Sequence, residues 1–208
     1  MKNAFVTNIA AALIVFVSTP ALAGNGAIGK VMTLTGAAES SSQKGATQVL
    51  SVGATFNEGD RIITHADTRL RILLPEKIAM QLGPNAEMTI VHPTPGETRV
   101  SLNQGELMSS VHHFSATERP RFEVRTRSAS MGVRGTTFFV AETPSKPTFV
   151  CICHGTVAVK TQDKETAITS EHHDAPKFVD PEKGTLIAAK AGVDHKDADA
   201  AALQKLVE

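Results

Sequence analysis

The sequence predicts a mainly β protein, a two-sheet sandwich or jelly-roll-like fold, with a short C-terminal α-helix. Short runs of β-forming residues recur between residues 26 and 159, and turn signals such as Gly83-Pro84-Asn85 separate them. An alanine-rich stretch with helical spacing follows Pro181. Strands that recur every roughly 8 to 12 residues are typical of antiparallel sandwiches.

The first 23 residues have the layout of a cleavable signal peptide. Lys2 precedes an apolar stretch over residues 10–17, and the small-residue sequence Ala21-Leu22-Ala23 follows. This order of charge, apolar run and small residues is typical of export signals, and the run is shorter than the roughly 20 residues that span a bilayer. We therefore expect cleavage after Ala23, a periplasmic location and no transmembrane anchor.

Composition and charge limit the function classes. The chain has 21 basic and 21 acidic residues and neither Trp nor Tyr. A nucleic-acid binder needs a basic surplus and usually offers aromatic stacking platforms, so we expect no nucleic-acid partner. The length after cleavage, about 185 residues, fits one β domain with a tail.

The expected strands lie in one β domain over residues 24–160. In the segment 122–126, apolar and charged residues alternate, so Phe122 and Val124 should face the core while Glu123 and Arg125 face solvent. Other expected strands are 30–34, 61–64, 70–74 and 88–91.

Two segments follow this domain. Residues 161–193 are expected to form a β extension or loop that contains His172 and His173. Residues 194–208 are expected to form the helix, with Asp194 as N-cap and 195–207 helical, because Leu203 and Leu206 lie near one helical face. Such a short helix should either pack against the β domain or fray.

Several motifs in the β domain occur in a recognisable order. They are the turn Glu58-Gly59-Asp60 before Arg61-Ile62-Ile63-Thr64, then Leu82-Gly83-Pro84-Asn85, then Phe122-Glu123-Val124-Arg125-Thr126, and finally Val133-Arg134-Gly135-Thr136-Thr137-Phe138. In this order they resemble the periplasmic FecR domain over residues 26–159.

The resemblance implies a module that binds or senses something in the envelope. The iron-uptake regulator that gives the family its name also has an anti-sigma region and a spanning helix, which we do not expect in this chain. Gly59 and Asp60 are expected to form a turn. Arg134, Gly135 and Thr136 are expected to fix a corner, because Gly135 permits a tight bend and Arg134 can donate to backbone carbonyls.

The segment Cys151-Ile152-Cys153-His154 is the most unusual local feature. Residues two apart in a strand share a face, so both thiols should project together with Ile152 on the opposite side. Their Cα atoms would lie roughly 6.5 Å apart, which makes a disulfide awkward, whereas metal bonds of about 2.3 Å could span the gap.

Nearby histidines could complete a metal site. His172 and His173 follow after a turn, and only one of them should face the cysteines because neighbours on a strand point to opposite sides. His154 could join if Gly155 bends the chain, and His195 is a further candidate ligand.

A set of cysteines and histidines suits zinc or copper. The segment is one residue short of the Cys-x-x-Cys-His motif, which argues against covalent haem. Thiol-redox chemistry, and a purely structural role for buried cysteines, also remain open.

The sequence contains no Gly-x-Ser-x-Gly, His-Glu-x-x-His, P-loop or dinucleotide motif. We therefore expect a non-enzymatic binding or sensory module with an envelope protein or small ligand as partner. The alternative is a metal-binding or thiol-redox protein.

Overall fold

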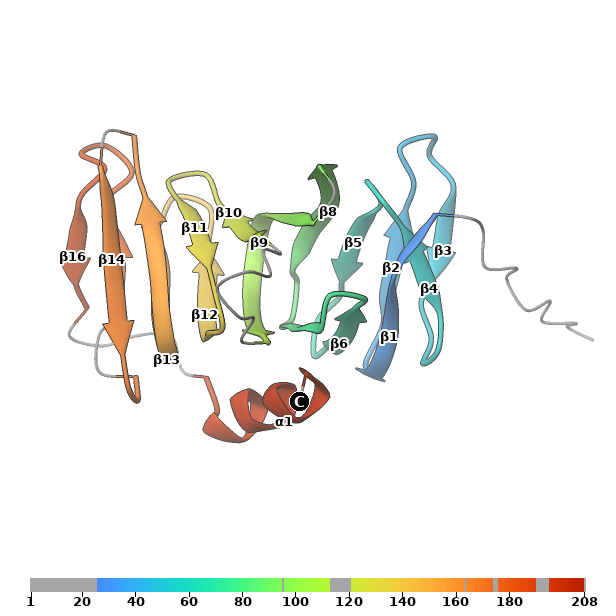
Figure 1. Ribbon diagram of the computed structural model, residues 1–208. Coiled ribbons are helices and arrows are strands. Elements are labelled where there is room, and N and C mark those ends of the chain that lie inside the picture. Colours follow the sequence, from blue (N-terminus) through green and yellow to red (C-terminus); the bar gives the residue numbers. More distant parts are fainter. Residues whose placement is uncertain are drawn as a thin grey trace, which may run out of the picture.

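The computed structural model is a two-layer β sandwich with one helix packed on its outside (Figure 1). It describes residues 26–94, 96–112, 121–162, 164–173, 176–189 and 195–207. The expected signal peptide and the expected N-cap Asp194 lie outside these residues. The predicted mainly β sandwich is confirmed.

One layer, called layer A, lies next to the helix. Its strands follow the order β4 (Thr55–Asn57), β1 (Ala27–Thr35), β6 (Arg69–Leu74), β7 (Ile78–Leu82), β9 (Glu97–Val111), β12 (Thr137–Glu142), β13 (Thr148–Lys160), β15 (Lys177–Val179) and β16 (Leu186–Ala188).

The second layer, called layer B, lies on the far side from the helix. Its order is β3 (Thr47–Val49), β2 (Ala38–Ser41), β5 (Arg61–Thr64), β8 (Glu87–Thr94), β9, β10 (Arg121–Arg125), β11 (Ser130–Val133), β13 and β14 (Glu165–Ser170). Strands β9 and β10 pair in parallel, and the other pairs between described strands are antiparallel.

Strands β9 and β13 belong to both layers. The first half of β9 pairs with β8 and β10 in layer B, and the second half pairs with β7 and β12 in layer A. The change of layer occurs at Gly105, where φ is +91° and an added Cβ would lie 2.4 Å from the Cα of Ala86. Strand β13 changes layer at Gly155, where φ is +103°. Glycine is needed at both bends because other residues rarely adopt such φ values.

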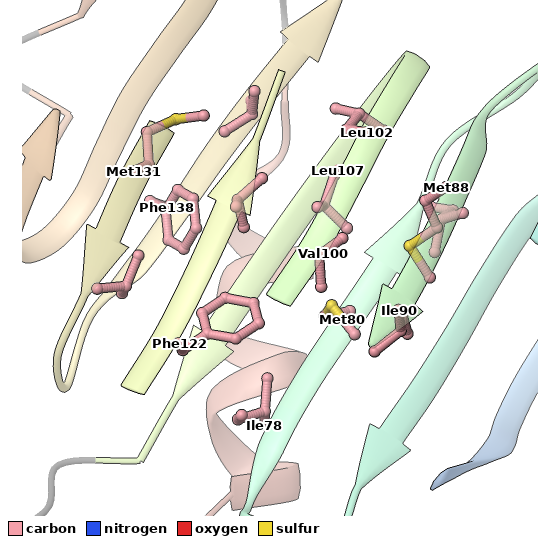
Figure 2. Close-up of a cluster of buried hydrophobic side chains, with 14 of the residues drawn as sticks. Ile78, Met80, Met88, Ile90, Val100, Leu102, Leu107, Phe122, Met131 and Phe138 are labelled. Atoms are coloured by element: carbon pink, nitrogen blue, oxygen red, sulfur yellow. The ribbon is translucent and has the colours of Figure 1, made fainter. Parts of the chain in front are cut away.

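The main core fills the space between the layers (Figure 2). Met80 and Phe138 point inward from layer A, while Met88, Val100 and Phe122 point inward from layer B. All five side chains are buried. The alternation over 122–126 is confirmed, since Val124 is also buried and Arg125 is exposed.

A second, smaller core lies between the outer face of layer A and helix α1 (Asp197–Val207). The helix packs against β7, β9 and β12, which it crosses below the middle of the sandwich in Figure 1. It contributes Ala200, Leu203 and Val207, which meet Met108 and Phe139 of layer A. Because this face is covered, β7 and β12 are buried on both sides.

Ion pairs also hold the helix to the sheet. Asp199 in its first turn lies 2.8 Å from the Nη2 of Arg71 on β6 and 3.7 Å from the Nη2 of Arg69. Arg71 also donates to Gln81 of β7 at 2.6 Å. The helix begins two residues later than expected, at Asp197 rather than 195, and it packs against the β domain rather than fraying.

Candidate functional site

The first half of β13 places both cysteines on the outer face of layer A. Cys151 and Cys153 belong to the second core, beside helix α1, while Ile152 between them points into the main core. Both cysteines are buried and neither forms a disulfide. The strand alternation predicted from the sequence thus brings the two thiols to one side.

Two histidines from distant segments meet these thiols. His173 lies in the bend after β14, and its Nδ1 is 3.5 Å from the Sγ of Cys151. His195 lies just before α1, and its Nε2 is 3.7 Å from the Sγ of Cys153 and 3.0 Å from the Nδ1 of His173. The group of Cys151, Cys153, His173 and His195 is called the Cys/His cluster below.

Asp197 lies at the rim of the Cys/His cluster. Its Oδ1 is 2.9 Å from the Nε2 of His173, and its Oδ2 is 3.8 Å from the Nε2 of His172. The side chains of Asp197 and His172 are 69% and 76% exposed, against 20% for His173. Of the two adjacent histidines, only His173 therefore faces the thiols.

Packing fixes the orientation of both imidazoles. The ring of His195 stacks on Phe139 of β12 with centroids 4.4 Å apart and planes 4° from parallel. His173 has φ +51°, a left-handed conformation that is uncommon for residues other than glycine. The hydrogen-bonded contact with Asp197 then holds its Nε2 side outward.

The surroundings favour the uncharged forms of Cys153 and His173. Burial, the neighbouring Cys151 thiol and the Asp197 carboxylate raise the pKa of Cys153 to about 12. Burial and the neighbouring His195 lower the pKa of His173, although Asp197 opposes this change. Near neutral pH, Cys153 is therefore a thiol and His173 a neutral imidazole, the form that binds metals.

His154 lies outside the Cys/His cluster, although the sequence made it a candidate ligand. It follows Cys153 directly on β13, at a register irregularity of the β12–β13 pair, and it is exposed whereas Cys153 is buried. Its Nδ1 is 3.4 Å from the backbone oxygen of Glu171. Gly155 does bend the strand, but the bend leads β13 into layer B rather than turning His154 toward the thiols.

The sequence did not single out Asp197 or Phe139. An acidic residue in the first turn of a helix is common, because it interacts favourably with the helix dipole, so Asp197 gave no specific signal. Phe139 belongs to an apolar strand, where any residue could be core.

The expected corner joins β11 to β12. Gly135 has φ +61° there, and Arg134 is exposed. The hydroxyl of Thr136 donates to the backbone oxygen of Thr156 at 2.9 Å and accepts from the backbone nitrogen of Thr156 at 3.2 Å. Thr136 therefore fastens this corner to β13 directly after its glycine bend.

The expected turn joins β4 to β5. Gly59 has φ +78°, and its backbone nitrogen donates to the oxygen of Ile90 at 2.9 Å. The carboxylate of Asp60 accepts from the backbone nitrogen of Asn57 at 2.9 Å. These bonds close the turn and contribute no reactive group.

A small cavity lies beside the Cys/His cluster, between the start of α1 and layer A. Its volume is about 80 Å³, and His195, Asp199, Glu106 and Arg69 are among the residues that line it. Pockets for drug-sized ligands measure roughly 300–1,000 Å³. This cavity therefore suits water or an ion rather than an organic ligand.

Comparison with known proteins places this geometry in context. A family model described as FecR protein matches residues 60–158. The fold is similar to two crystal structures of a "putative anti-sigma factor" from Parabacteroides distasonis ATCC 8503, each with a TM-score of 0.53 and 21% sequence identity. The alignment covers 62% of this chain and 58% of that protein's chain, so it spans little more than half of that protein.

No curated protein matches the sequence. Among the described residues, no helix is long and apolar enough to cross a membrane. The family match includes Cys151 and Cys153 but ends within β13, before His173, His195 and Asp197.

Proposed function

We propose that this chain works as an exported, non-enzymatic binding or sensory module of the FecR type, because the FecR family model matches residues 60–158. In this role, the β domain contacts an envelope protein or a small ligand in the periplasm. The family match is the observation that carries the proposal, since it includes both strands that join the layers, β9 and most of β13.

Export is supported by the signal-like pattern of residues 1–23. The test is expression of the full chain in a Gram-negative host, followed by fractionation and intact-mass measurement. We expect a periplasmic product that begins at Gly24. A matched variant with Ala21→Lys and Ala23→Lys should stay uncleaved, because the cleavage site requires small residues. Cytoplasmic, full-length wild-type protein would contradict export.

A partner-binding role is testable at the exposed apolar side chains, because protein partners bind where apolar surface is exposed in patches. The described residues offer Val49 on β3 at one end of the sandwich, 78% exposed, and Ile187 on β16 at the other end, 49% exposed. Val52, which follows β3 in the chain, is 63% exposed. We expect a photo-crosslinking residue at one of these ends to yield a discrete complex in cells. The exposed, charged Arg125 on β10 is the matched control position.

A regulatory role also predicts an effect on transcription. Deletion of the gene should change a defined set of transcripts, and the wild-type gene should restore them. If deletion leaves transcription unchanged and no surface position yields a discrete complex, the proposed role is wrong.

A further inference from the structure

We propose that Cys151, Cys153, His173 and His195 bind one thiophilic metal ion with a filled d shell, either Zn²⁺ or Cu⁺. The four side chains come from β13, from the bend after β14 and from the segment before α1. The fold alone brings these three segments together. The site does not depend on the regulatory role proposed above, because it rests on these side chains and not on the family match.

Three donor distances within the Cys/His cluster are close to those of a tetrahedral site. With zinc bonds of about 2.3 Å to sulfur and 2.0–2.1 Å to nitrogen, tetrahedral angles place sulfur and nitrogen about 3.6 Å apart and two nitrogens about 3.3 Å apart. The two sulfur–nitrogen distances are 3.5 and 3.7 Å, and the nitrogen–nitrogen distance is 3.0 Å. The donor atoms of Cys151, His173 and His195 lie within 4.8 Å of one another, whereas Cys153 lies outside this group and contacts His195. Three donors are therefore in place, and the Cys153 thiol has to move toward them to complete the site.

Asp197 prepares His173 as a ligand. Its carboxylate accepts a hydrogen bond only if the Nε2 of His173 carries the proton, at the observed 2.9 Å. The Nδ1 of His173 then presents its lone pair to the thiols and to His195. Metal-ligating histidines commonly donate their other ring nitrogen to a carboxylate in this way.

The donor set selects the class of ion. Two sulfurs and two imidazole nitrogens suit Zn²⁺ or Cu⁺, whereas Mg²⁺ and Ca²⁺ prefer oxygen ligands. Binding of Zn²⁺ forms two zinc–sulfur and two zinc–nitrogen bonds, and the two thiols release their protons to solvent. Loss of the two protons leaves two thiolates, whose charges balance that of Zn²⁺. The resulting neutral site suits the apolar surroundings of Phe139 and Phe149.

The bound ion would fasten helix α1 to the sheet. His195 lies two residues before α1 begins, and the cysteines lie on β13 of layer A. An ion bonded to both segments therefore adds to the packing of Leu203 and the ion pair of Asp199. Metal binding should slow the exchange of α1 backbone amides with deuterium.

The first experiment loads the tag-free mature protein with Zn²⁺ or with Cu⁺ under reducing, oxygen-free conditions and measures bound metal by elemental analysis. We expect one ion per chain, and competition with a chelator of known affinity for each ion identifies the preferred one. Cobalt(II) substitution should give the sulfur-to-metal charge-transfer band and the intense visible bands of a tetrahedral site. Mg²⁺ should not bind.

Variants then test the ligands one by one. Cys151→Ser/Cys153→Ser, His173→Ala and His195→Ala should each lose more affinity than Asp197→Asn, for which we expect a loss of about 10-fold to 100-fold as an outer-shell residue. His154→Ala is the matched control, since it is adjacent to Cys153 but exposed, and its Nδ1 lies near the backbone oxygen of Glu171. Its affinity should equal that of the wild type.

Far-UV circular dichroism shows which variants are folded. If the double cysteine variant fails to fold, the two single histidine variants decide, because they leave the buried thiols in place. The proposal is wrong if folded wild-type protein binds neither ion stoichiometrically, or if the histidine variants bind as tightly as His154→Ala. Recovery of the exported protein with a stable Cys151–Cys153 disulfide that excludes metal would also overturn it.

Discussion

Replacing Gly105 by alanine tests whether this glycine is required where β9 passes from layer B to layer A. Alanine would have to adopt φ +91° at this bend. Its Cβ would also lie 2.4 Å from the Cα and 2.5 Å from the Cβ of Ala86. Backbone atoms cannot move aside as a flexible side chain does, so β9 and the residues before β8 would have to separate.

The two effects add to a large loss of stability. A left-handed backbone costs a residue with a Cβ about 1–2 kcal/mol. Overpacking of a buried contact costs about 1–3 kcal/mol more. We therefore expect Gly105→Ala to lower the free energy of unfolding by about 2–5 kcal/mol, the sum of these two costs.

Gly45 provides the matched control. Its φ is +84°, close to that of Gly105, but no atom lies within 4 Å of an added Cβ. Gly45→Ala should therefore lose only the backbone contribution of about 1–2 kcal/mol. Urea unfolding of both variants, followed by circular dichroism, gives the two values. If Gly105→Ala is no less stable than Gly45→Ala, the close approach to Ala86 does not constrain the bend.

Three further predictions concern the ion pairs and the helix. Burial opposes ionisation of Glu123, but hydrogen bonds, including one from Arg99 at 2.7 Å, lower its pKa from 4.5 to about 2. The ionised Glu123 should therefore contribute about 3 kcal/mol to the free energy of unfolding above pH 4.5, and this contribution should disappear as the pH falls toward 2. If the stability of Glu123→Gln in urea depends on pH in the same way as that of the wild type, the expectation is wrong. Asp199→Asn leaves Arg71 without its charged partner, so α1 amides should exchange faster by mass spectrometry while those of β10 stay protected. Leu203→Ala removes a fully buried side chain of α1 from the contact between the helix and layer A. The free energy of unfolding should fall by about 2–5 kcal/mol, seen as a lower urea midpoint, or α1 should detach, seen as a loss of helical circular dichroism signal.

Much of the fold was predictable because side-chain alternation reports the buried face of a strand. The segment around Val124 showed its core side directly, and the same rule put Cys151 and Cys153 together. Strand order was not predictable, since periodicity carries no information about neighbours. The two long strands that change layer were also missed: glycine at 105 and 155 marks a bend but does not say where the chain continues.

The Cys/His cluster was predictable only in part for the same reason. His173 and His195 were among the candidates, but only the folded chain shows that they meet the thiols. His154 was a candidate because it is adjacent in sequence, yet in the folded chain it is exposed and lies near the backbone oxygen of Glu171. Asp197 could not be recognised from the sequence, because its contact with His173 exists only after folding brings the bend at His173 next to the start of α1.

The two shared strands also limit how this molecule can change shape. Because β9 and β13 are each covalently continuous through both layers, the layers cannot slide past one another without breaking the hydrogen-bond ladders on both sides of Gly105 and Gly155. Sliding of one sheet over the other is therefore not a way in which this protein can transmit a signal. A change of shape that preserves these ladders is therefore confined to the periphery, for example to α1, which the second core and the ion pairs of Asp199 hold against layer A.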